Sequence, residues 1–266
     1  MQDDRVETVP QDGRRTVKSF VLRSSRLAPF QVEALERFTD RYSIKYQQKE
    51  LNFQALFHNE RPVFVEIGFG MGDAAYRIAQ SKPGYNYLGI EVFLNGFAKL
   101  LHRVGSSEMP NLRLIRFDAV AVLESMIPDA SIAGFHIFFP DPWPKKKHYK
   151  RRLIQAPFAQ LLAKKLIEGG YVYCVTDWEP YAQQMLEVFE TIPELENPYG
   201  GYAPPVPWRP TTSFERKGLE KNHPVLEVWS VGCPNIEKAA RSGFFNIIVI
   251  FTYLRFQLLW LLSPLL

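Results

Sequence analysis

The hydrophobic pattern of the chain begins with one amphipathic segment and continues as a regular alternation of strands and helices. Residues 28–44 place Val32, Leu35 and Phe38 on one face of a predicted helix. Beyond Pro62, short apolar runs alternate with helical segments. The strand runs are VFVEI, YNYLGIEV, NLRLIRF, IAGFHIFF and YVYCVT, and the helical segments lie near 74–80, 95–104, 119–126, 153–167 and 179–190. This alternation predicts an α/β fold, a mostly parallel sheet with helices on both faces.

Changes in composition divide the chain into three parts. We predict a flexible basic arm at residues 1–19, an α/β domain at residues 20–234 and an atypical apolar tail at residues 235–266. Within the domain, residues 193–224 are rich in proline and glycine, which predicts an ordered loop without core helices.

The tail ends in a long apolar run, residues 243–266 (GFFNIIVIFTYLRFQLLWLLSPLL). Its length suffices to span a bilayer, but Arg255 lies near its middle, where a charge costs about 2.5–3.5 kcal/mol. Full exposure to water would promote association. The tail is therefore expected to pack against protein, to aggregate or to associate weakly with a membrane.

Composition narrows the class of protein. The 266 residues are 46% hydrophobic and 23% charged, which is typical of one sizeable globular core. The net charge of +4 is too small to indicate a nucleic-acid partner by itself. The two cysteines, Cys174 and Cys233, lie far apart without metal-ligand spacing, so we expect no disulfide framework and no metal site. With no apolar secretory region at the start, a cytoplasmic location fits best.

The first predicted strand runs into a glycine-rich turn, VEIGFGMGD. Gly68, Gly70 and Gly72 let the backbone turn tightly and approach a ligand closely. A dinucleotide fingerprint would require glycine or alanine where the chain has Asp73. Glu66 would repel a pyrophosphate but attract an ammonium group, directly or through water. The motif favours a nucleoside that carries an amino acid, with an ordinary strand-to-helix turn as the alternative.

Two further acids follow the second and third predicted strands. Glu91 ends LGIE, where a carboxylate can accept hydrogen bonds from both hydroxyls of a ribose. Asp118 in RFDAV is placed to accept from an adenine amine or to cap the following helix, and the two roles are compatible. The carboxyl ends of parallel strands meet at one edge, so the glycines and acids are expected to lie together. S-adenosylmethionine is a ligand that needs all of these groups.

The fourth predicted strand leads into FPDPWPKKKHYKRR. Proline fixes its own φ and restricts the residue before it, so Asp141, between Pro140 and Pro142, loses most of its conformational freedom. A preset carboxylate at this edge suits a catalytic or substrate-binding role. The alternative is a rigid loop whose aspartate binds nearby backbone.

A dense run of lysine and arginine follows the prolines. Alone it is typical of a solvated charged turn, but beside a cofactor site it favours contacts with the phosphates of a nucleic acid. The residues predicted to contact the RNA backbone are Lys146, Lys147, Lys150, Arg151 and Arg152.

These motifs resemble those of the bacterial tRNA (guanine-N7-)-methyltransferases. The similar segments are RTVKSFVLRSSRL, VEIGFGMGD, GIE, FPDPWPKKKHYKRR and PTTSFERKG, and the resemblance covers roughly residues 15–231. It implies a Rossmann-like class I methyltransferase fold, S-adenosyl-L-methionine as methyl donor and tRNA as partner. It also implies methylation of a guanine at N7 in the variable loop of tRNA, usually at position 46.

The resemblance assigns roles to individual residues, with Asp141 at the catalytic position. The implied cofactor-binding residues are Glu66, Gly68, Gly70, Gly72, Glu91, Asp118 and Asp141. The implied substrate-binding residues are Lys145, Asp177, Thr212, Ser213, Phe214 and Glu215.

Two other classes of protein fit these motifs less well. A tRNA-binding or assembly protein that kept the fold and lost catalysis is disfavoured by the intact glycines and motif acids. A nucleotide-dependent oxidoreductase is disfavoured by the glycine spacing and by Glu66.

Overall fold

A computed structural model describes residues 18–20, 26–220 and 224–233. Most of the predicted arm and the whole predicted tail lie outside the described residues, including the apolar run 243–266. None of the helices in the described part of the chain is long and apolar enough to cross a membrane.

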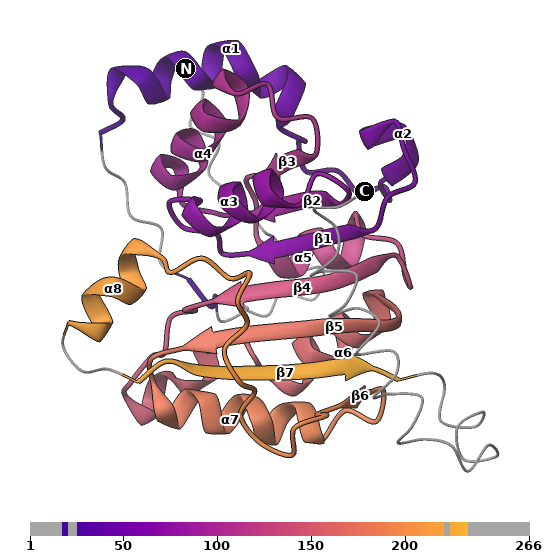
Figure 1. Ribbon diagram of the computed structural model, residues 1–266, viewed down its shortest axis with the longest axis vertical. Coiled ribbons are helices and arrows are strands. Elements are labelled where there is room, and N and C mark those ends of the chain that lie inside the picture. Colours follow the sequence, from indigo (N-terminus) through magenta and orange to yellow (C-terminus); the bar gives the residue numbers. More distant parts are fainter. Residues whose placement is uncertain (1–17, 21–25, 221–223, 234–266) are drawn as a thin grey trace, which may run out of the picture.

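The described residues form a seven-stranded sheet in the order β3-β2-β1-β4-β5-β7-β6 (Figure 1). The first five strands pair in parallel, while β7 runs antiparallel to both β5 and β6. The predicted mostly parallel sheet is therefore confirmed. The strands are β1 (Val63–Ile67), β2 (Asn86–Ile90), β3 (Leu112–Ile115), β4 (Ile132–Phe138), β5 (Leu166–Thr176), β6 (Leu195–Glu196) and β7 (Leu226–Gly232).

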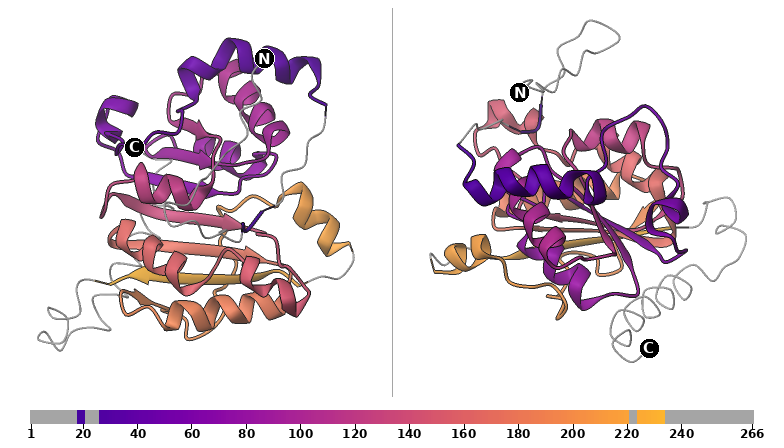
Figure 2. Two further views of the ribbon diagram at one scale, coloured as in Figure 1. Left: turned by 180° about the vertical axis from the view of Figure 1, so that it is seen from behind. Right: turned by 90° about the horizontal axis from the view of Figure 1, so that it is seen from above.

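Helices cover both faces of the sheet, with α5, α6 and α7 on one face and α1, α3 and α4 on the other (Figures 1 and 2). The chain order reverses between β1 and β4, which is where open α/β sheets bind ligands. The helices are α1 (Pro29–Tyr42), α2 (Phe53–Phe57), α3 (Asp73–Ser81), α4 (Leu94–Ser106), α5 (Ala119–Ser125), α6 (Ala156–Lys165), α7 (Glu179–Glu190) and α8 (Ser213–Leu219), with a 3₁₀ helix η1 (Lys146–Arg151).

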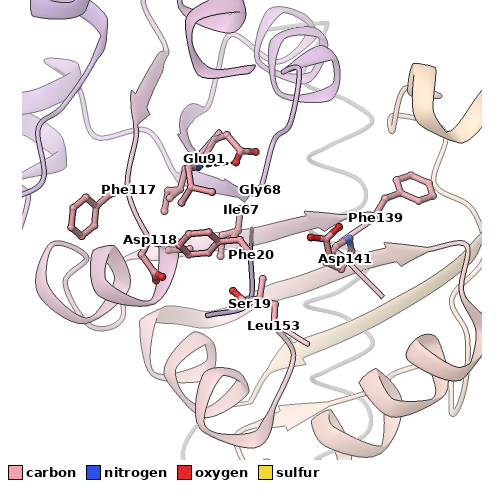
Figure 3. A pocket seen from close by; sticks show the side chains of 14 residues that line it. Ser19, Phe20, Ile67, Gly68, Glu91, Phe117, Asp118, Phe139, Asp141 and Leu153 are labelled. Atoms are coloured by element: carbon pink, nitrogen blue, oxygen red, sulfur yellow. Dashed lines mark hydrogen bonds between the residues drawn. The ribbon is translucent and has the colours of Figure 1, made fainter. Parts of the chain in front are cut away.

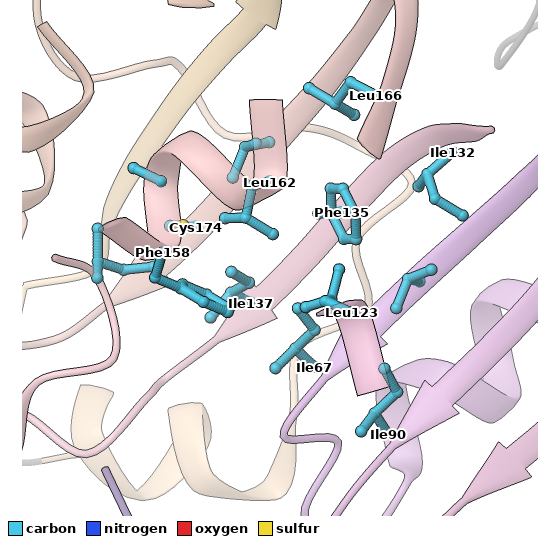
Figure 4. Close-up of a cluster of buried hydrophobic side chains, with 14 of the residues drawn as sticks. Ile67, Ile90, Leu123, Ile132, Phe135, Ile137, Phe158, Leu162, Leu166 and Cys174 are labelled. Atoms are coloured by element: carbon cyan, nitrogen blue, oxygen red, sulfur yellow. The ribbon is translucent and has the colours of Figure 1, made fainter. Parts of the chain in front are cut away.

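Alternate residues of β1 point into two different cores, as the two-residue period of a strand requires. Val63, Val65 and Ile67 belong to the core beneath α5, α6 and α7 (Figure 4), whereas Phe64 belongs to the opposite one. Glu66 therefore lies on the same side as Phe64, which is the side of α3 and α4. This register places the carboxylate of Glu66 beside the buried His136 of β4.

The proline-rich segment, residues 197–212, covers the part of the second face that the helices leave open (Figure 1). The ring of Trp208 lies 5.2 Å from that of His136 and 5.6 Å from that of Tyr173. The backbone N–H of Ala203 donates to the Glu227 carbonyl at 2.8 Å. The segment is thus ordered against the sheet by aromatic packing.

Two features of local structure differ from the sequence prediction. A short helix outside the core, α8, lies within residues 193–224; the N–H of Glu215 donates to Thr212 Oγ1 at 3.1 Å at its start, which the T-x-x-E spacing signals. On α1, Leu35 and Phe38 pack against the core as predicted, but Val32 is 42% exposed, and Ala34 and Tyr42 are the buried apolar residues. Gln31 sets this rotation, since its Nε2 donates to the Asn95 carbonyl at 2.7 Å.

Two glycines allow α4 to approach the turn between β1 and α3. A Cβ added at Gly96 would lie 2.0 Å from the carbonyl oxygen of Gly70, and one at Gly72 would lie 2.7 Å from Leu100 Cβ. The contact at Gly96 involves backbone, which cannot rotate away as a side chain would. The backbone of α4 is therefore packed directly against the turn.

This contact predicts that Gly96→Ala destabilises the protein. Alanine favours helix by about 1 kcal/mol over glycine, but overpacking against backbone costs about 1–3 kcal/mol and here displaces a carbonyl. We expect a net loss of up to about 2 kcal/mol in the free energy of unfolding, measured by urea denaturation. Gly84→Ala is the control, because a Cβ there meets no atom within 4 Å. Equal stability of the two variants would contradict the packing described.

Candidate functional site

A pocket opens at the carboxyl ends of β1, β2 and β4, beside the start of α5 (Figure 3). Its wall combines the glycine turn, the predicted acids and two residues from the start of the chain. The lining residues are Ser19, Phe20, Ile67, Gly68, Ile90, Glu91, Val92, Phe117, Asp118, Ala119, Phe139, Pro140, Asp141 and Leu153. The structure thus brings Glu91, Asp118 and Asp141 to one pocket.

The glycine turn uses conformations that other residues rarely adopt. Gly68, Gly70 and Gly72 have φ values of 73°, 54° and 77°, all in the left-handed region. Of the three, Gly68 lines the pocket, whereas Gly70 and Gly72 shape the turn behind it. The N–H of Gly72 donates to the carbonyl of Phe69 at 2.8 Å, which closes the turn before α3.

Glu91 connects the end of β2 to this turn. Its Oε2 accepts from the Gly70 N–H at 2.7 Å, and its Oε1 accepts from the Val92 and Phe93 N–H groups at 2.7 and 3.0 Å. Burial raises the pKa of Glu91, the three backbone N–H groups oppose this effect, and the charge of Asp141 adds to it. A carboxylate offers about four acceptor positions, so one remains for a ligand.

Glu66 lies behind the pocket wall and does not line it. It is 6% exposed, and among the described residues its Oε2 has no hydrogen-bond partner. Burial, with a contribution from the charge of Glu91, raises the pKa of the Glu66 carboxyl to about 8. A buried polar atom without a partner is costly, which indicates a site that a ligand or water completes.

Asp118 is the N-cap of α5 and also lines the pocket. Its Oδ1 accepts from the Val120 N–H at 2.8 Å and from the Ala121 N–H at 3.4 Å. The expected helix cap is therefore confirmed. Both of these hydrogen bonds go to Oδ1, and the side chain is half-buried at the pocket wall (Figure 3).

The loop that carries Asp141 has strained backbone on both sides of the proline pair. Phe139 and Trp143 have φ values of 52° and 44°, which are unfavourable for bulky residues. The Phe139 N–H donates to the Val175 carbonyl at 2.7 Å, so the end of β5 holds the start of the loop. Asp141 itself is exposed and lines the pocket mouth. Such strain is typical of functional loops.

Among the described residues that line the pocket, the only charged side chains are those of Glu91, Asp118 and Asp141. An anionic ligand would be repelled here, while a cationic one would be attracted.

Positive charge lies next to this wall, on η1. The side chains of Lys145, Lys146, Lys147 and Lys150 are exposed. The guanidinium of Arg151 lies 4.9 Å from the centre of the Trp143 ring, which joins η1 to the Asp141 loop. The exposed lysines are available to a polyanion in solution.

Arg152 corrects the prediction for the basic run, because it is 2% exposed and cannot reach the phosphate of a docked nucleic acid. Its Nε donates to the Pro142 carbonyl at 2.8 Å, and its Nη1 donates to Gln184 Oε1 at 2.6 Å. Its guanidinium lies 3.7 Å from the centre of the Tyr149 ring. Arg152 therefore supports the Asp141 loop from inside the protein.

Of the residues predicted to bind substrate, Lys145, Asp177, Thr212 and Glu215 are described, and none of these four lines the pocket. Asp177 directly follows β5 and is half-buried, and Lys145 directly precedes η1. The first turn of α8, with Thr212 and Glu215, lies beside the same edge of the sheet (Figures 1 and 2). The side chains of Ser213 and Phe214 are outside the described ones.

The sequence analysis did not predict that Ser19 and Phe20 belong to the pocket, because the predicted boundary between the arm and the domain falls between them. Both line the pocket, and Trp143 Nε1 donates to the Ser19 carbonyl at 3.1 Å. The sequence feature that could have indicated their role is the segment RTVKSFVLRSSRL, which resembles an N-terminal motif of the family. It has no hydrophobic period that would predict a contact with the pocket.

Solved structures share this fold. The 16S rRNA methyltransferase KamB matches with a TM-score of 0.52 and 14% identity, covering 70% of this chain and 96% of that chain. The aminoglycoside resistance methyltransferase NpmB1 matches with a TM-score of 0.50 and 13% identity, covering 70% and 95%. At this identity the likeness establishes a Rossmann-like methyltransferase fold.

Sequence relatives are much more similar. A family model described as "Putative methyltransferase" matches residues 60–228. A tRNA (guanine-N(7)-)-methyltransferase of Bordetella pertussis is 47% identical over 216 residues, which cover 81% of this chain and 85% of the relative. Proteins with the same name from Nitrosospira multiformis (47% identical; 82% and 93% covered) and Chromobacterium violaceum (46%; 81% and 95%) also match. The chain belongs to the tRNA (guanine-N(7)-)-methyltransferase family.

Proposed function

We propose that this protein transfers a methyl group from S-adenosylmethionine to N7 of a guanine in tRNA. The observation that carries the proposal is the separation of charge at one edge of the sheet: an acidic pocket lies directly beside the exposed basic helix η1. The pocket suits a cationic small molecule, and η1 suits the phosphates of a nucleic acid. The names of the relatives, the methyltransferase fold and the resemblance of the motifs support the same activity.

The pocket fits S-adenosylmethionine, which carries positive charge on its sulfonium and ammonium groups and supplies the methyl group. Glu91 has one remaining acceptor position for a ribose hydroxyl, and Asp118 is placed for the adenine amine. Glu66 Oε2 has no hydrogen-bond partner among the described residues, so it suits the ammonium group, directly or through water. The same acids oppose the pyrophosphate of NAD, so the oxidoreductase alternative is not favoured.

Asp141 is proposed to stabilise charge rather than to transfer a proton. Guanine N7 presents an in-plane lone pair, so no base has to deprotonate it, and attack forms the N7–carbon bond as the sulfur–carbon bond breaks. The purine becomes cationic as the sulfonium becomes neutral. A carboxylate at the pocket mouth favours this developing charge. A strained, internally supported loop keeps the carboxylate in place without reorganisation.

The finer assignments follow the family resemblance. We propose that the guanine lies in the variable loop of tRNA, at position 46, and that Lys145, Asp177 and the first turn of α8 contact the substrate. The cytoplasm is the proposed location, since the substrate is tRNA. The alternative of a catalytically inactive tRNA-binding protein is not favoured, because the turn and every motif acid are present and the relatives are named as methyltransferases.

The decisive assay incubates the full chain with labelled S-adenosylmethionine and bulk tRNA and maps 7-methylguanosine in the product. Asp141→Asn keeps the size of the side chain and removes its charge, so turnover should fall at least about a hundredfold while cofactor affinity changes little. Glu124→Gln, an exposed carboxylate on α5, is the matched control and should leave turnover unchanged. Near-normal turnover of Asp141→Asn would remove this residue from the mechanism.

The pH dependence of cofactor binding tests the role of Glu66. With a pKa near 8, the Glu66 carboxyl is protonated at neutral pH without ligand, and a bound cation favours its charged form. Binding then releases a proton, so affinity should rise by up to about tenfold per pH unit up to about pH 8 and level off above it. Calorimetry on wild type and Glu66→Gln measures this effect. The variant should bind more weakly and lose most of the slope; an equal slope in both proteins would contradict the role.

Salt dependence tests η1. If three or four cations of the basic run contact phosphate, the affinity for tRNA should fall with salt at a log–log slope near −3. Replacing Lys146, Lys147 and Lys150 together by alanine should flatten most of this slope. The control replaces Lys49 and Lys164, which are exposed outside η1. A slope unchanged by the triple replacement would assign η1 to a solvated surface.

A further inference from the structure

A buried cluster of charged side chains joins α8 to the sheet, with Arg209 at its centre. Arg209 Nη1 and Nη2 donate to Glu215 Oε2 and Oε1 at 2.7 and 2.9 Å, a two-pronged ion pair. Nη2 also donates to Glu227 Oε1 at 3.0 Å, and Nε donates to the Tyr173 hydroxyl at 3.0 Å. Tyr173 in turn donates to Glu227. One guanidinium therefore connects the proline-rich segment, α8, β5 and β7.

The burial of this cluster makes its geometry rigid. The side chains of Arg209, Glu215 and Glu227 are 7%, 6% and 1% exposed. Water cannot replace a broken contact there, and a partner left alone would be a buried, uncompensated charge. The fork of an arginine also fixes direction, since two parallel hydrogen bonds define the plane of the carboxylate.

Few other contacts hold α8 in place. Within the described part of the chain, no helix or strand packs extensively on α8, whereas α1 packs along α4 and α7 packs on both β5 and β7. The carboxylate of Glu215 closes the start of α8 by accepting from the Thr212 N–H at 3.2 Å. Arg209 binds that same carboxylate. The position of the first turn of α8 thus depends on Arg209.

We propose that Arg209 is a positioning residue for tRNA: through the buried carboxylate of Glu215 it holds Thr212 and the first turn of α8 at the carboxyl edge of the sheet beside the Asp141 loop. The proposal rests on the proposed function, in which the first turn of α8 contacts the substrate. Arg209 acts through Glu215 and does not touch the nucleic acid itself. Its 7% exposure sets it apart from the exposed lysines of η1.

The binding of S-adenosylmethionine should not depend on Arg209. None of Arg209, Glu215 and Glu227 lines the acidic pocket. Loss of Arg209 should therefore weaken tRNA binding and leave S-adenosylmethionine binding nearly unchanged. A general loss of folding would instead weaken both together.

The experiment compares Arg209→Gln, Glu215→Gln and the double variant with wild type. We expect Arg209→Gln to raise the KM for tRNA and the equilibrium Kd for tRNA at least about tenfold, with a smaller change in kcat. The Kd for S-adenosylmethionine should stay within about twofold. The double variant should be no worse than the worse single variant, since residues that act as one unit are not additive. Arg209→Lys should not restore tRNA binding, because it keeps the charge but loses the fork.

Two controls separate positioning from other roles. Lys165→Gln removes an ion pair between a buried lysine and a half-exposed carboxylate, Lys165 Nζ to Asp129 Oδ1 at 2.6 Å, at the amino end of β5. It should lower stability without changing the Kd for tRNA. Tyr173→Phe removes only the hydroxyl that supports Arg209, and should raise the Kd for tRNA less than Arg209→Gln does. If Arg209→Gln does not fold, the Kd of Tyr173→Phe for tRNA still tests whether Arg209 positions α8.

Three results would overturn the proposal. Additive effects of Arg209→Gln and Glu215→Gln, or a salt slope that falls by about one in Arg209→Gln, would show that Arg209 contacts phosphate directly. Parallel weakening of cofactor and tRNA binding would reduce its role to folding. Unchanged tRNA affinity in both Arg209→Gln and Tyr173→Phe would remove the role altogether. A wild type that binds tRNA without methylating it would refute the proposed function only, since the equilibrium Kd still tests Arg209.

Discussion

The carboxylate of Glu91 is the contact around which the pocket is built. One oxygen accepts from the Gly70 N–H and the other from the Val92 and Phe93 N–H groups, so the end of β2 holds the turn that follows β1. This bond requires left-handed backbone at the turn and no side chain at Gly96, where α4 meets it. The sheet register, the glycines and the helix packing are therefore all needed for the contact between Glu91 and the turn. The carboxylate of Glu91 still faces the pocket.

The Asp141 loop shows how charge and strain are combined at this edge. Its carboxylate is exposed, yet the backbone on either side adopts unfavourable conformations at Phe139 and Trp143. Arg152 compensates from within, because its buried guanidinium binds the Pro142 carbonyl. The basic run thus contains two kinds of cation. Exposed lysines are available to phosphate, and one buried arginine maintains the geometry of the acid.

The proline-rich segment covers the part of one sheet face that the helices leave open, and both aromatic packing and a buried polar cluster hold it there. Aromatic rings fill the layer beneath it, and the cluster of Arg209, Glu215, Tyr173 and Glu227 holds its end. Apolar packing would tolerate small shifts, whereas a buried forked ion pair does not, because any displacement leaves a charge without its partner. Such anchoring suits a short helix that must present polar groups at a binding edge.

The five parallel strands with the helices that alternate with them, the glycine turn and the acids at the strand ends could be predicted from the sequence by itself, because local periodicity and the chemistry of glycine and proline decide them. Parallel strands end at one edge, so Glu91, Asp118 and Asp141 were expected together. Burial was decided only by tertiary structure: Arg152 lies inside because Tyr149 and Gln184 surround it, and Glu66 lies behind the pocket because β1 turns it toward α3 and α4. Those partners come from distant segments, and no local pattern encodes which of them a side chain will meet.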